Sequence, residues 1–332
     1  MTTALALFSG GLDSILACRL VAAQHIRVVA VKFVTPFFGY ELLAKEEEYR
    51  AAMREQYGIE VLVREVSEPY LAMLRQPAHG YGKNFNPCVD CKILLMRSAR
   101  AMLAELGADF LISGEVLGQR PMSQRQDTLR IIERDSGCEG LLLRPLCAQK
   151  LPPTQPELVG LIDREQLLNF QGRSRQPQME LAARFNITDY PSPAGGCVLT
   201  DSNQARRIAA FYGEHDLVTV ADMRLLLAGR QFRLPHGAWL AMGRREAENE
   251  ELLARALPTD WLVTLMDRPG PTGVLRFAGH PDDFAAAAGL VTRYGKKGEE
   301  EAPARVIFSR GGERREQMAT PLAEEVYAPW RR

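Results

Sequence analysis

The sequence predicts an α/β protein with a doubly wound parallel sheet in its N-terminal part, followed by a smaller α+β domain. Short apolar runs of β type alternate with helical patterns, and a glycine-rich turn follows the first run directly. The runs cover residues 4–8, 27–34, 60–66 and 108–113. This alternation favours parallel strands joined by right-handed crossovers. Ligands of such sheets gather at the carboxyl ends of the strands.

The elements follow in a regular order. ALALF leads into SGGLDS and the helical pattern ILACRLVAAQ, and RVVAVKFV forms the second run. Helical segments are expected at 41–57 and 92–106. Residues 150–200 are rich in turns, so we expect a first domain over 1–200 and a second over 201–332. In the second domain, QARRIAAFYGEH and VADMRLLLAG favour helices, whereas FRLPHGAWLAMG and ARVIFSR favour strands.

The composition narrows the class of protein. The 332 residues carry 41 basic and 41 acidic side chains, balanced in both predicted domains, and 46% are hydrophobic. These values exclude a disordered, collagen-like or coiled-coil chain, and also a binder that holds nucleic acid by bulk charge. No apolar run approaches the roughly 18 residues of a membrane span, and the N-terminus lacks the basic start of a signal peptide. We therefore expect a cytoplasmic protein without a membrane partner, whose six cysteines are reduced.

The segment Ser9–Ser14, with the sequence SGGLDS, lies between a predicted strand and a predicted helix. Gly10 and Gly11 let the backbone approach a phosphate closely, and the helix N-terminus offers free N–H groups to it. Ser9 and Ser14 add hydroxyl donors. The carboxylate of Asp13 would repel a phosphate unless a cation lies between them, which Mg²⁺ with ATP provides. The alternative to a phosphate-binding loop is a purely structural glycine turn in which Asp13 caps the helix.

SGGLDS resembles the PP-loop of the ATP pyrophosphatase family, whose members cleave ATP between its α- and β-phosphates and adenylate a substrate. The resemblance implies that Ser9, Gly10, Gly11, Asp13 and Ser14 bind ATP. It leaves the acceptor open, because the family includes GMP, NAD and argininosuccinate synthetases as well as enzymes that thiolate tRNA.

Three cysteines are candidates for sulfur chemistry. Cys88 and Cys91 form a CxxC at the start of a predicted helix, where the helix N-terminus is expected to lower thiol pKa values. Cys197 follows two glycines that permit close packing. Three cysteines fit an iron–sulfur cluster with one exchangeable ligand, and they fit equally a persulfide relay. The remaining cysteines, Cys18, Cys138 and Cys147, are expected to be small buried hydrophobes.

The residues around these cysteines indicate which enzymes of the ATP pyrophosphatase family the chain resembles. NPCVDCK resembles the catalytic-cysteine segment of bacterial tRNA 2-thiouridylases, with Cys91 at the matching place. The stretch from Ser113 to Gln124 resembles the GE-x-x-GQ-x-x-SQ motif of 4-thiouridine synthases, and LLRPL at 142–146 resembles their Arg-Pro-Leu segment. The extra Cys88 resembles iron–sulfur-dependent tRNA thiolases, which implies a 4Fe–4S cluster on Cys88, Cys91 and Cys197, with Cys91 and Cys197 catalytic.

The same resemblance assigns residues that follow the strand ending at Ser113. It implies that Gly114 and Gln119 contact ATP, and it makes Glu115 and Gln119 candidates for the acceptor side. Because SGGLDS begins at residue 9, we expect this chain to lack the N-terminal THUMP-type tRNA-binding domain of the 4-thiouridine synthases.

The C-terminal part resembles the NFACT-R type of RNA-binding domain in the segments HGAWL, GRREAEN and DDFAAAAGLVTRYGKK. The resemblance implies phosphate contacts from Arg244, Arg245, Lys296 and Lys297, which would position RNA without reading its sequence.

We therefore hypothesise an ATP-dependent tRNA thiolase that uses Mg²⁺ and a 4Fe–4S cluster, with inorganic sulfide or a persulfide carrier as sulfur donor. The alternatives are a cluster-free persulfide mechanism, a PP-loop sulfurtransferase or amidotransferase for a small molecule, and a non-enzymatic RNA-binding adaptor. The oligomeric state and the modified nucleoside stay open.

Overall fold

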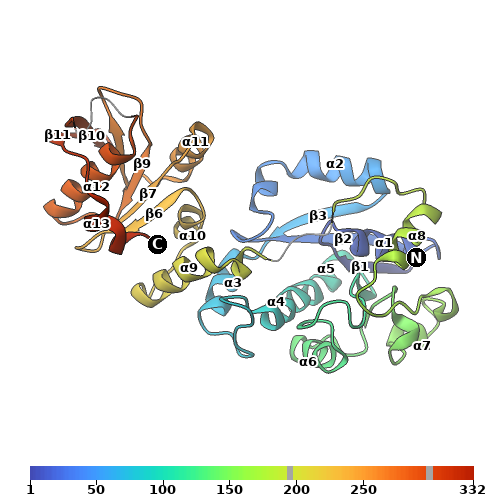
Figure 1. Cartoon of the computed structure of the whole chain (residues 1–332). Coiled ribbons are helices and arrows are strands. Elements are labelled where there is room, and N and C mark those ends of the chain that lie inside the picture. Colours follow the sequence, from blue (N-terminus) through green and yellow to red (C-terminus); the bar gives the residue numbers. More distant parts are fainter. Residues whose placement is uncertain (193–196, 297–301) are drawn as a thin grey trace. The chain divides into compact units, whose positions relative to one another are not determined.

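The computed structural model describes residues 1–192, 197–296 and 302–332. The chain divides into two compact units, Met1–Asp201 and Ser202–Arg332, drawn in Figure 1. No helix in these three described stretches has the length and apolar character needed to cross a membrane.

The N-terminal unit is built on a five-stranded sheet with the order β3-β2-β1-β4-β5, in which every neighbouring pair is parallel. Its strands are β1 (Thr3–Leu7), β2 (Arg27–Val34), β3 (Glu60–Glu65), β4 (Phe110–Ser113) and β5 (Leu142–Leu143). Its helices are α1 (Leu12–Ala22), α2 (Glu46–Tyr57), α3 (Ser67–Arg75), α4 (Cys88–Ala101), α5 (Leu103–Leu106), α6 (Gln126–Ser136), α7 (Gln155–Leu158) and α8 (Gln176–Arg184).

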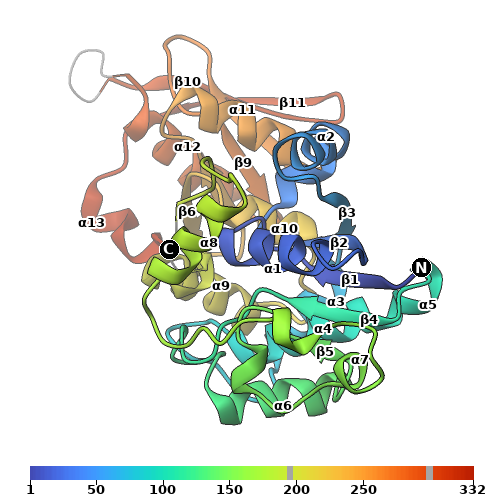
Figure 2. The same cartoon turned by 90° about the vertical axis from the view of Figure 1, so that its right-hand side faces the viewer.

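Both faces of this sheet are covered by helices. Ala4 and Ala6 of β1 face a core that includes α1 and α8, whereas Leu5 faces the core with α4 and α6. Figure 2 shows α1 and α8 on one side of the strands and α4 and α6 on the other. Side chains two apart on a strand point to the same face, so the continuous apolar runs are explained by burial on both faces. The prediction of a doubly wound parallel sheet is confirmed.

The structure differs from the sequence prediction in three local details. The expected helix 41–57 consists of a 3-10 turn, Tyr40–Ala44, followed by α2. The expected helix 92–106 begins four residues earlier, at Cys88, and is divided into α4 and α5. Strand β5 is only two residues long, which is too short for an apolar run to reveal.

The C-terminal unit contains a six-stranded sheet with the order β11-β10-β8-β9-β7-β6, all of whose neighbours are antiparallel. Its strands are β6 (Arg230–Arg233), β7 (Trp239–Met242), β8 (Trp261–Leu265), β9 (Gly273–Arg276), β10 (Ala304–Arg310) and β11 (Glu313–Ala319). Its helices are α9 (Ser202–Glu214), α10 (Val220–Leu226), α11 (Glu246–Arg255), α12 (Pro281–Tyr294) and α13 (Glu324–Tyr327).

The sheet of this unit also has apolar residues on both faces. Helix α12 packs on one face through Ala287 and Val291, and α10 and α11 pack on the other through Leu225 and Leu252. The expected α+β character of this part is therefore present.

Candidate functional site

The glycine-rich loop lies between the carboxyl end of β1 and the start of α1. Gly10 has a φ of +81°, a conformation that side chains other than glycine rarely adopt. A Cβ at Gly10 would also lie 3.0 Å from the hydroxyl of Tyr49. Ser14 Oγ donates to the carbonyl of Gly11 (2.7 Å), and Ser9 Oγ accepts from the N–H of Gly11 (3.2 Å). The hydroxyls thus hold the loop in a turn at the N-terminus of α1.

Gly114 supports this loop from the neighbouring strand β4. A Cβ built at Gly114 would lie 2.5 Å from the carbonyl carbon and oxygen of Asp13 and 2.6 Å from the amide nitrogen of Ser14. Only glycine lets the chain after β4 approach the first turn of α1 so closely. Gly114 does not line the cavity described below, so its structural role is close packing under the loop.

A cavity of about 650 Å³ opens beside the loop. Its walls include residues of the loop, α2 and the segment 189–192, and three cationic side chains, Lys32, Arg120 and Arg175. Lys32 lies near the carboxyl end of β2, and its Nζ donates to the carbonyl of Ser9. Burial lowers the pKa of Lys32, against the attraction of Glu41. The cavity therefore combines free helix N–H groups with positive charge, which suits a polyphosphate.

Asp13 lines this cavity and has one carboxylate oxygen without a hydrogen-bond partner among the described residues. Its Oδ2 accepts a hydrogen bond from Gln119 Nε2 (3.1 Å), whereas the buried Oδ1 has no hydrogen-bond partner among the described residues. Burial raises the pKa of Asp13, against Gln119, Arg175 and Arg120, which lower it. A desolvated carboxylate oxygen without a partner is expensive, unless a cation binds it. Gln119, which this bond places beside Asp13, also lines the cavity.

The three candidate cysteines come together although 106 positions separate Cys91 from Cys197. Asn84 Nδ2 donates to the carbonyl of Thr200 (2.7 Å), and the N–H of Phe85 donates to the carbonyl of Leu199 (3.3 Å). These bonds hold the segment after Cys197 against the segment before Cys88. Electrostatic repulsion couples Cys91 to both other thiols and couples Cys197 to Cys88. All three are half-buried, whereas Cys18, Cys138 and Cys147 are buried, as predicted.

Tyr70 of α3 is a neighbour of the thiols that sequence reasoning missed. It is only 1% exposed, it interacts with all three cysteines, and its hydroxyl hydrogen-bonds to Cys91. The rings of Phe37 and Phe38 lie 5.5 and 5.6 Å from its ring. A single tyrosine in a helical pattern carries no motif, so only the fold reveals it.

The prediction that the helix N-terminus lowers thiol pKa values is wrong for Cys91. Burial raises the pKa of Cys91 to about 11, although Tyr70 and Lys92 act in the opposite direction. Burial also raises the pKa of Cys197. The desolvation of a thiolate therefore outweighs the helix terminus at Cys91, and burial favours the neutral form of this thiol.

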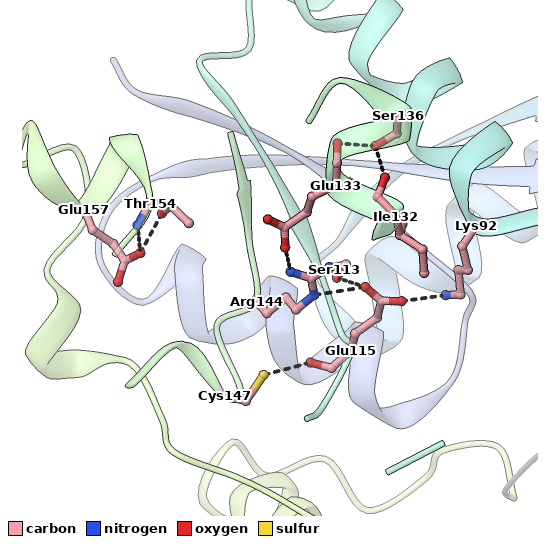
Figure 3. Close-up of polar contacts among 10 residues, drawn as sticks. All are labelled: Lys92, Ser113, Glu115, Ile132, Glu133, Ser136, Arg144, Cys147, Thr154 and Glu157. Carbon is pink, nitrogen blue, oxygen red and sulfur yellow. Dashed lines mark hydrogen bonds and ion pairs between the residues drawn. The ribbon is translucent and has the colours of Figure 1, made fainter. Parts of the chain in front are cut away.

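Glu115, expected on the acceptor side, is held in a buried ion-pair network instead (Figure 3). Its carboxylate accepts from Arg144 Nε (3.1 Å) and lies 3.3 Å from Lys92 Nζ, and Arg144 also pairs with Glu133. Burial would raise the pKa of Glu115, but Lys92 and Arg144 outweigh it and hold the pKa below its ordinary value. Since Lys92 follows Cys91, Glu115 ties the cysteine-bearing helix to the end of β4.

The residues predicted to contact RNA lie in the C-terminal unit. Arg244 and Arg245 are exposed directly before α11, and Lys296 is exposed after α12. Arg244 is partly engaged, because it lies 3.5 Å from Glu248 and donates to the carbonyl of Gly229 (3.3 Å). Lys297 lies outside the described residues.

Comparison with known proteins follows the division into two units. Residues 1–150 match the family model described as thiamine biosynthesis protein (ThiI), and residues 229–331 match the NFACT protein RNA binding domain. The resemblances found in the sequence at both ends of the chain are thereby confirmed.

Among individual proteins, the chain is similar to a tRNA sulfurtransferase of Psychromonas ingrahamii, with 31% identity over 43% of this chain and 28% of the relative. The chain thus spans less than a third of that relative's length. A 4-thiouridine synthetase–RNA complex with bound ATP matches at 21% identity and a TM-score of 0.36, covering 68% of this chain and 52% of the other. The U34-tRNA thiolase NcsA of Methanococcus maripaludis, with its [4Fe-4S] cluster, matches at 15% identity and a TM-score of 0.32, covering 68% and 70%.

Proposed function

We propose that the protein is an ATP-dependent tRNA sulfurtransferase that adenylates a base carbonyl oxygen and replaces that oxygen with sulfur. One observation carries the proposal. The SGGLDS loop follows β1, and α4, which starts at Cys88, runs back from the carboxyl edge of the sheet towards the start of β4. Hence an anion-binding loop and a group of three thiols lie at the same edge of one sheet, where α/β proteins bind their ligands.

In this proposal the loop and the cations around the cavity hold the triphosphate of ATP. Ser9, Gly10, Gly11 and Ser14 surround the phosphates, and Lys32 and Arg175 offset their charge. The carbonyl oxygen of a uridine or cytidine attacks the α-phosphorus, and pyrophosphate leaves. The base has to be extruded from its stack to reach the loop, as enzymes that act on bases require. Sulfide then attacks the activated carbon, and AMP leaves with the former oxygen of the base. If the sulfur comes from a persulfide instead, its outer sulfur attacks the carbon and AMP leaves. A second thiol then cleaves the S–S bond, and the resulting disulfide has to be reduced by an external dithiol.

Asp13 fits a magnesium ion bound with the nucleotide. Its partnerless Oδ1 is a hard oxygen donor beside the phosphate-binding loop, and Mg²⁺ is usually held by one or two carboxylates together with substrate phosphates. When bound, the ion would neutralise charge on the leaving pyrophosphate. Gln119 orients the carboxylate through its bond to Oδ2.

The three thiols fit a 4Fe–4S cluster held by Cys88, Cys91 and Cys197. When bound, such a cluster would supply an iron with an open coordination position for a sulfur ligand. The raised pKa values favour this over a cluster-free persulfide relay, because a relay needs a free thiolate at neutral pH, whereas metal coordination deprotonates a thiol outright. Tyr70 stabilises the charged form of Cys91 through its hydroxyl.

The C-terminal unit is proposed to bind tRNA, with Arg244, Arg245, Lys296 and Lys297 as phosphate contacts. The match to an RNA-binding domain model supports this assignment. The two functional domains would be residues 1–200 and 201–332, and a tRNA substrate would place the protein in the cytoplasm.

The decisive experiment is mass analysis of tRNA nucleosides from a deletion strain, complemented with the wild type, Asp13→Asn or Cys197→Ala. We expect one thionucleoside to disappear, and to return only with the wild type. Cys18→Ala is the matched control, because it removes a thiol buried in α1 and outside the site. If no thionucleoside disappears, the tRNA assignment fails, and a small-molecule acceptor becomes the better hypothesis.

A further inference from the structure

In the C-terminal unit two arginines, Arg230 and Arg331, contact Tyr294, and a third, Arg244, acts electrostatically on Arg230. Tyr294 is the last residue of α12, and the guanidinium carbon of Arg230 lies 4.5 Å from the centre of its ring. Arg331 donates to the hydroxyl of Tyr294 (3.1 Å), and its guanidinium lies 5.5 Å from the ring centre of Tyr327. We call Arg230, Arg244, Tyr294 and Arg331 the arginine–tyrosine patch.

Backbone pairing fixes the members of this patch. Arg230 of β6 pairs with Met242 of β7, so the chain reaches Arg244 two residues after that pair. Arg230 Nη1 donates to the carbonyl of Gly243 (3.2 Å), which holds the start of β6 against this turn. At the other side, Arg331 forms a bridge with Phe232 of the same strand. Backbone pairing with the sheet therefore fixes where Arg230 and Arg331 start, and their side-chain contacts fix where the guanidinium groups lie.

The patch has an excess of positive charge. Arg331 lies 3.3 Å from Glu324, and Arg244 lies 3.5 Å from Glu248. For Arg230, by contrast, no carboxylate is within ion-pair distance in the described part of the chain. Burial lowers the pKa of Arg230, and repulsion from Arg244 and Arg331 adds to this, against the attraction of Tyr294 and Glu248. Like charges held together in this way are stabilised by a polyanion.

We propose that the arginine–tyrosine patch is a site for the phosphate backbone of RNA, and that Arg230 and Arg331 are phosphate-binding residues beyond Arg244. Planar guanidinium groups suit phosphate oxygens because they offer parallel N–H donors. The ring of Tyr294 orients the Arg230 guanidinium and leaves its free donors for the ligand. Lys296 follows Tyr294 by two residues and is exposed, so it extends the charge along the chain. The proposal rests on RNA as the substrate class of the proposed function.

The test measures the affinity of the full chain for a tRNA transcript and for poly(U) over a range of salt concentrations. Removing one phosphate-binding side chain should reduce the slope of log K against log salt by about one, equally for both RNAs. We expect Arg331→Gln and Arg230→Gln each to do this. The double variant should bind both RNAs about tenfold more weakly than the wild type at low salt. Arg230→Lys keeps the charge and should keep most of the slope. Arg314→Gln, an exposed arginine on β11, is the matched control and should change nothing.

The outcomes separate this inference from the proposed function. If the wild type binds RNA with a steep slope and the patch variants bind equally well, the patch assignment is wrong, although the enzyme assignment stands. If millimolar inorganic phosphate displaces RNA as effectively as poly(U) does, the patch is a small-anion site and the RNA assignment is overturned. If the variants weaken RNA binding but the deletion strain lacks no thionucleoside, the patch stands and the thiolase proposal falls. Arg331→Gln, at an exposed side chain, keeps the test valid if Arg230→Gln does not fold.

Discussion

Gly114 lies in direct backbone contact with Asp13, so that strand β4 supports the first turn of α1 without any intervening side chain. The two residues are 101 positions apart, and each belongs to a motif proposed to serve ATP. The contact explains why a glycine that does not line the cavity belongs to the site.

We predict that Gly114→Ala displaces the first turn of α1. The added methyl group would lie 2.5 Å from the Asp13 carbonyl, and overpacking of this kind costs about 1–3 kcal/mol. Chemical denaturation should show this loss, and ATP binding should weaken in parallel. Gly213→Ala in α9 is the control, because nothing lies within 4 Å of its Cβ. Unchanged stability and ATP affinity in Gly114→Ala would contradict the proposed packing.

We predict that Asp13→Asn separates stability from function. Because burial raises the pKa of Asp13, its ionised form is disfavoured in the folded nucleotide-free protein. The stability contributed by protonated Asp13 is fully present below its ordinary pKa of 3.8 and is lost as the pH rises through the raised value. The variant should therefore be more stable than the wild type at neutral pH, and this difference should shrink on acidification.

The same variant should lose the stabilisation that MgATP gives the wild type, and its rate of pyrophosphate release should fall about 100-fold or more. Thermal unfolding with and without MgATP between pH 3 and pH 8 tests the stability, and a pyrophosphate-release assay tests the rate. An Asp13→Asn protein that is still stabilised by MgATP would remove the carboxylate from the proposed metal site.

We predict that the three thiols hold iron together. After anaerobic purification, the wild type should absorb at about 400 nm, and Cys88→Ala, Cys91→Ala and Cys197→Ala should each lose this absorbance and the bound iron. Cys18→Ala should keep both. A colourless, iron-free wild type would leave the persulfide relay as the mechanism.

In the metal-free protein, alkylation of Cys91 should accelerate up to about pH 11, following its raised pKa. Tyr70→Phe should slow alkylation of Cys91 at pH 9, because it removes the hydroxyl that lowers this pKa. Mass spectrometry of the modified peptides measures both rates. Equal rates in the wild type and Tyr70→Phe would show that the hydroxyl does not act on Cys91.

We predict that Glu115→Gln is among the most destabilising conservative changes in the N-terminal unit. It leaves Arg144 and Lys92 without their shared buried carboxylate, a loss of about 3–5 kcal/mol. Glu133→Gln should cost less, because Glu133 is 24% exposed and water can replace it. Since the pKa of Glu115 is lowered, its stabilisation is present above its ordinary value of 4.5 and is lost as the pH falls through the lowered value. Acid unfolding of the wild type and both variants tests this order.

The fold of the N-terminal unit could be predicted because its strands are buried on both faces and therefore appear as continuous apolar runs. The loop could be predicted because its glycines and hydroxyls occupy adjacent positions. Cys197 could be identified only by its residue type and the two glycines before it, since the bonds from Asn84 and Phe85 that bring its segment to that of Cys88 are not visible in a sequence.

The cationic wall of the cavity was missed, although Lys32 interrupts an otherwise apolar run and could have indicated it. Arg175 and Tyr70 do not interrupt any comparable pattern, so the sequence does not indicate their positions in the site. The pKa of Cys91 was predicted in the wrong direction because the helix N-terminus is visible in the sequence, whereas the depth of burial is not.

The pairing of the segments around Asn84 and Thr200 has a consequence for biosynthesis. The ribosome delivers Cys88 and Cys91 early, but the third thiol arrives only when nearly all of the N-terminal unit has been translated. A nascent or prematurely terminated chain therefore presents two thiols without the third, so the three-thiol site proposed here can form only after the whole N-terminal unit has been made.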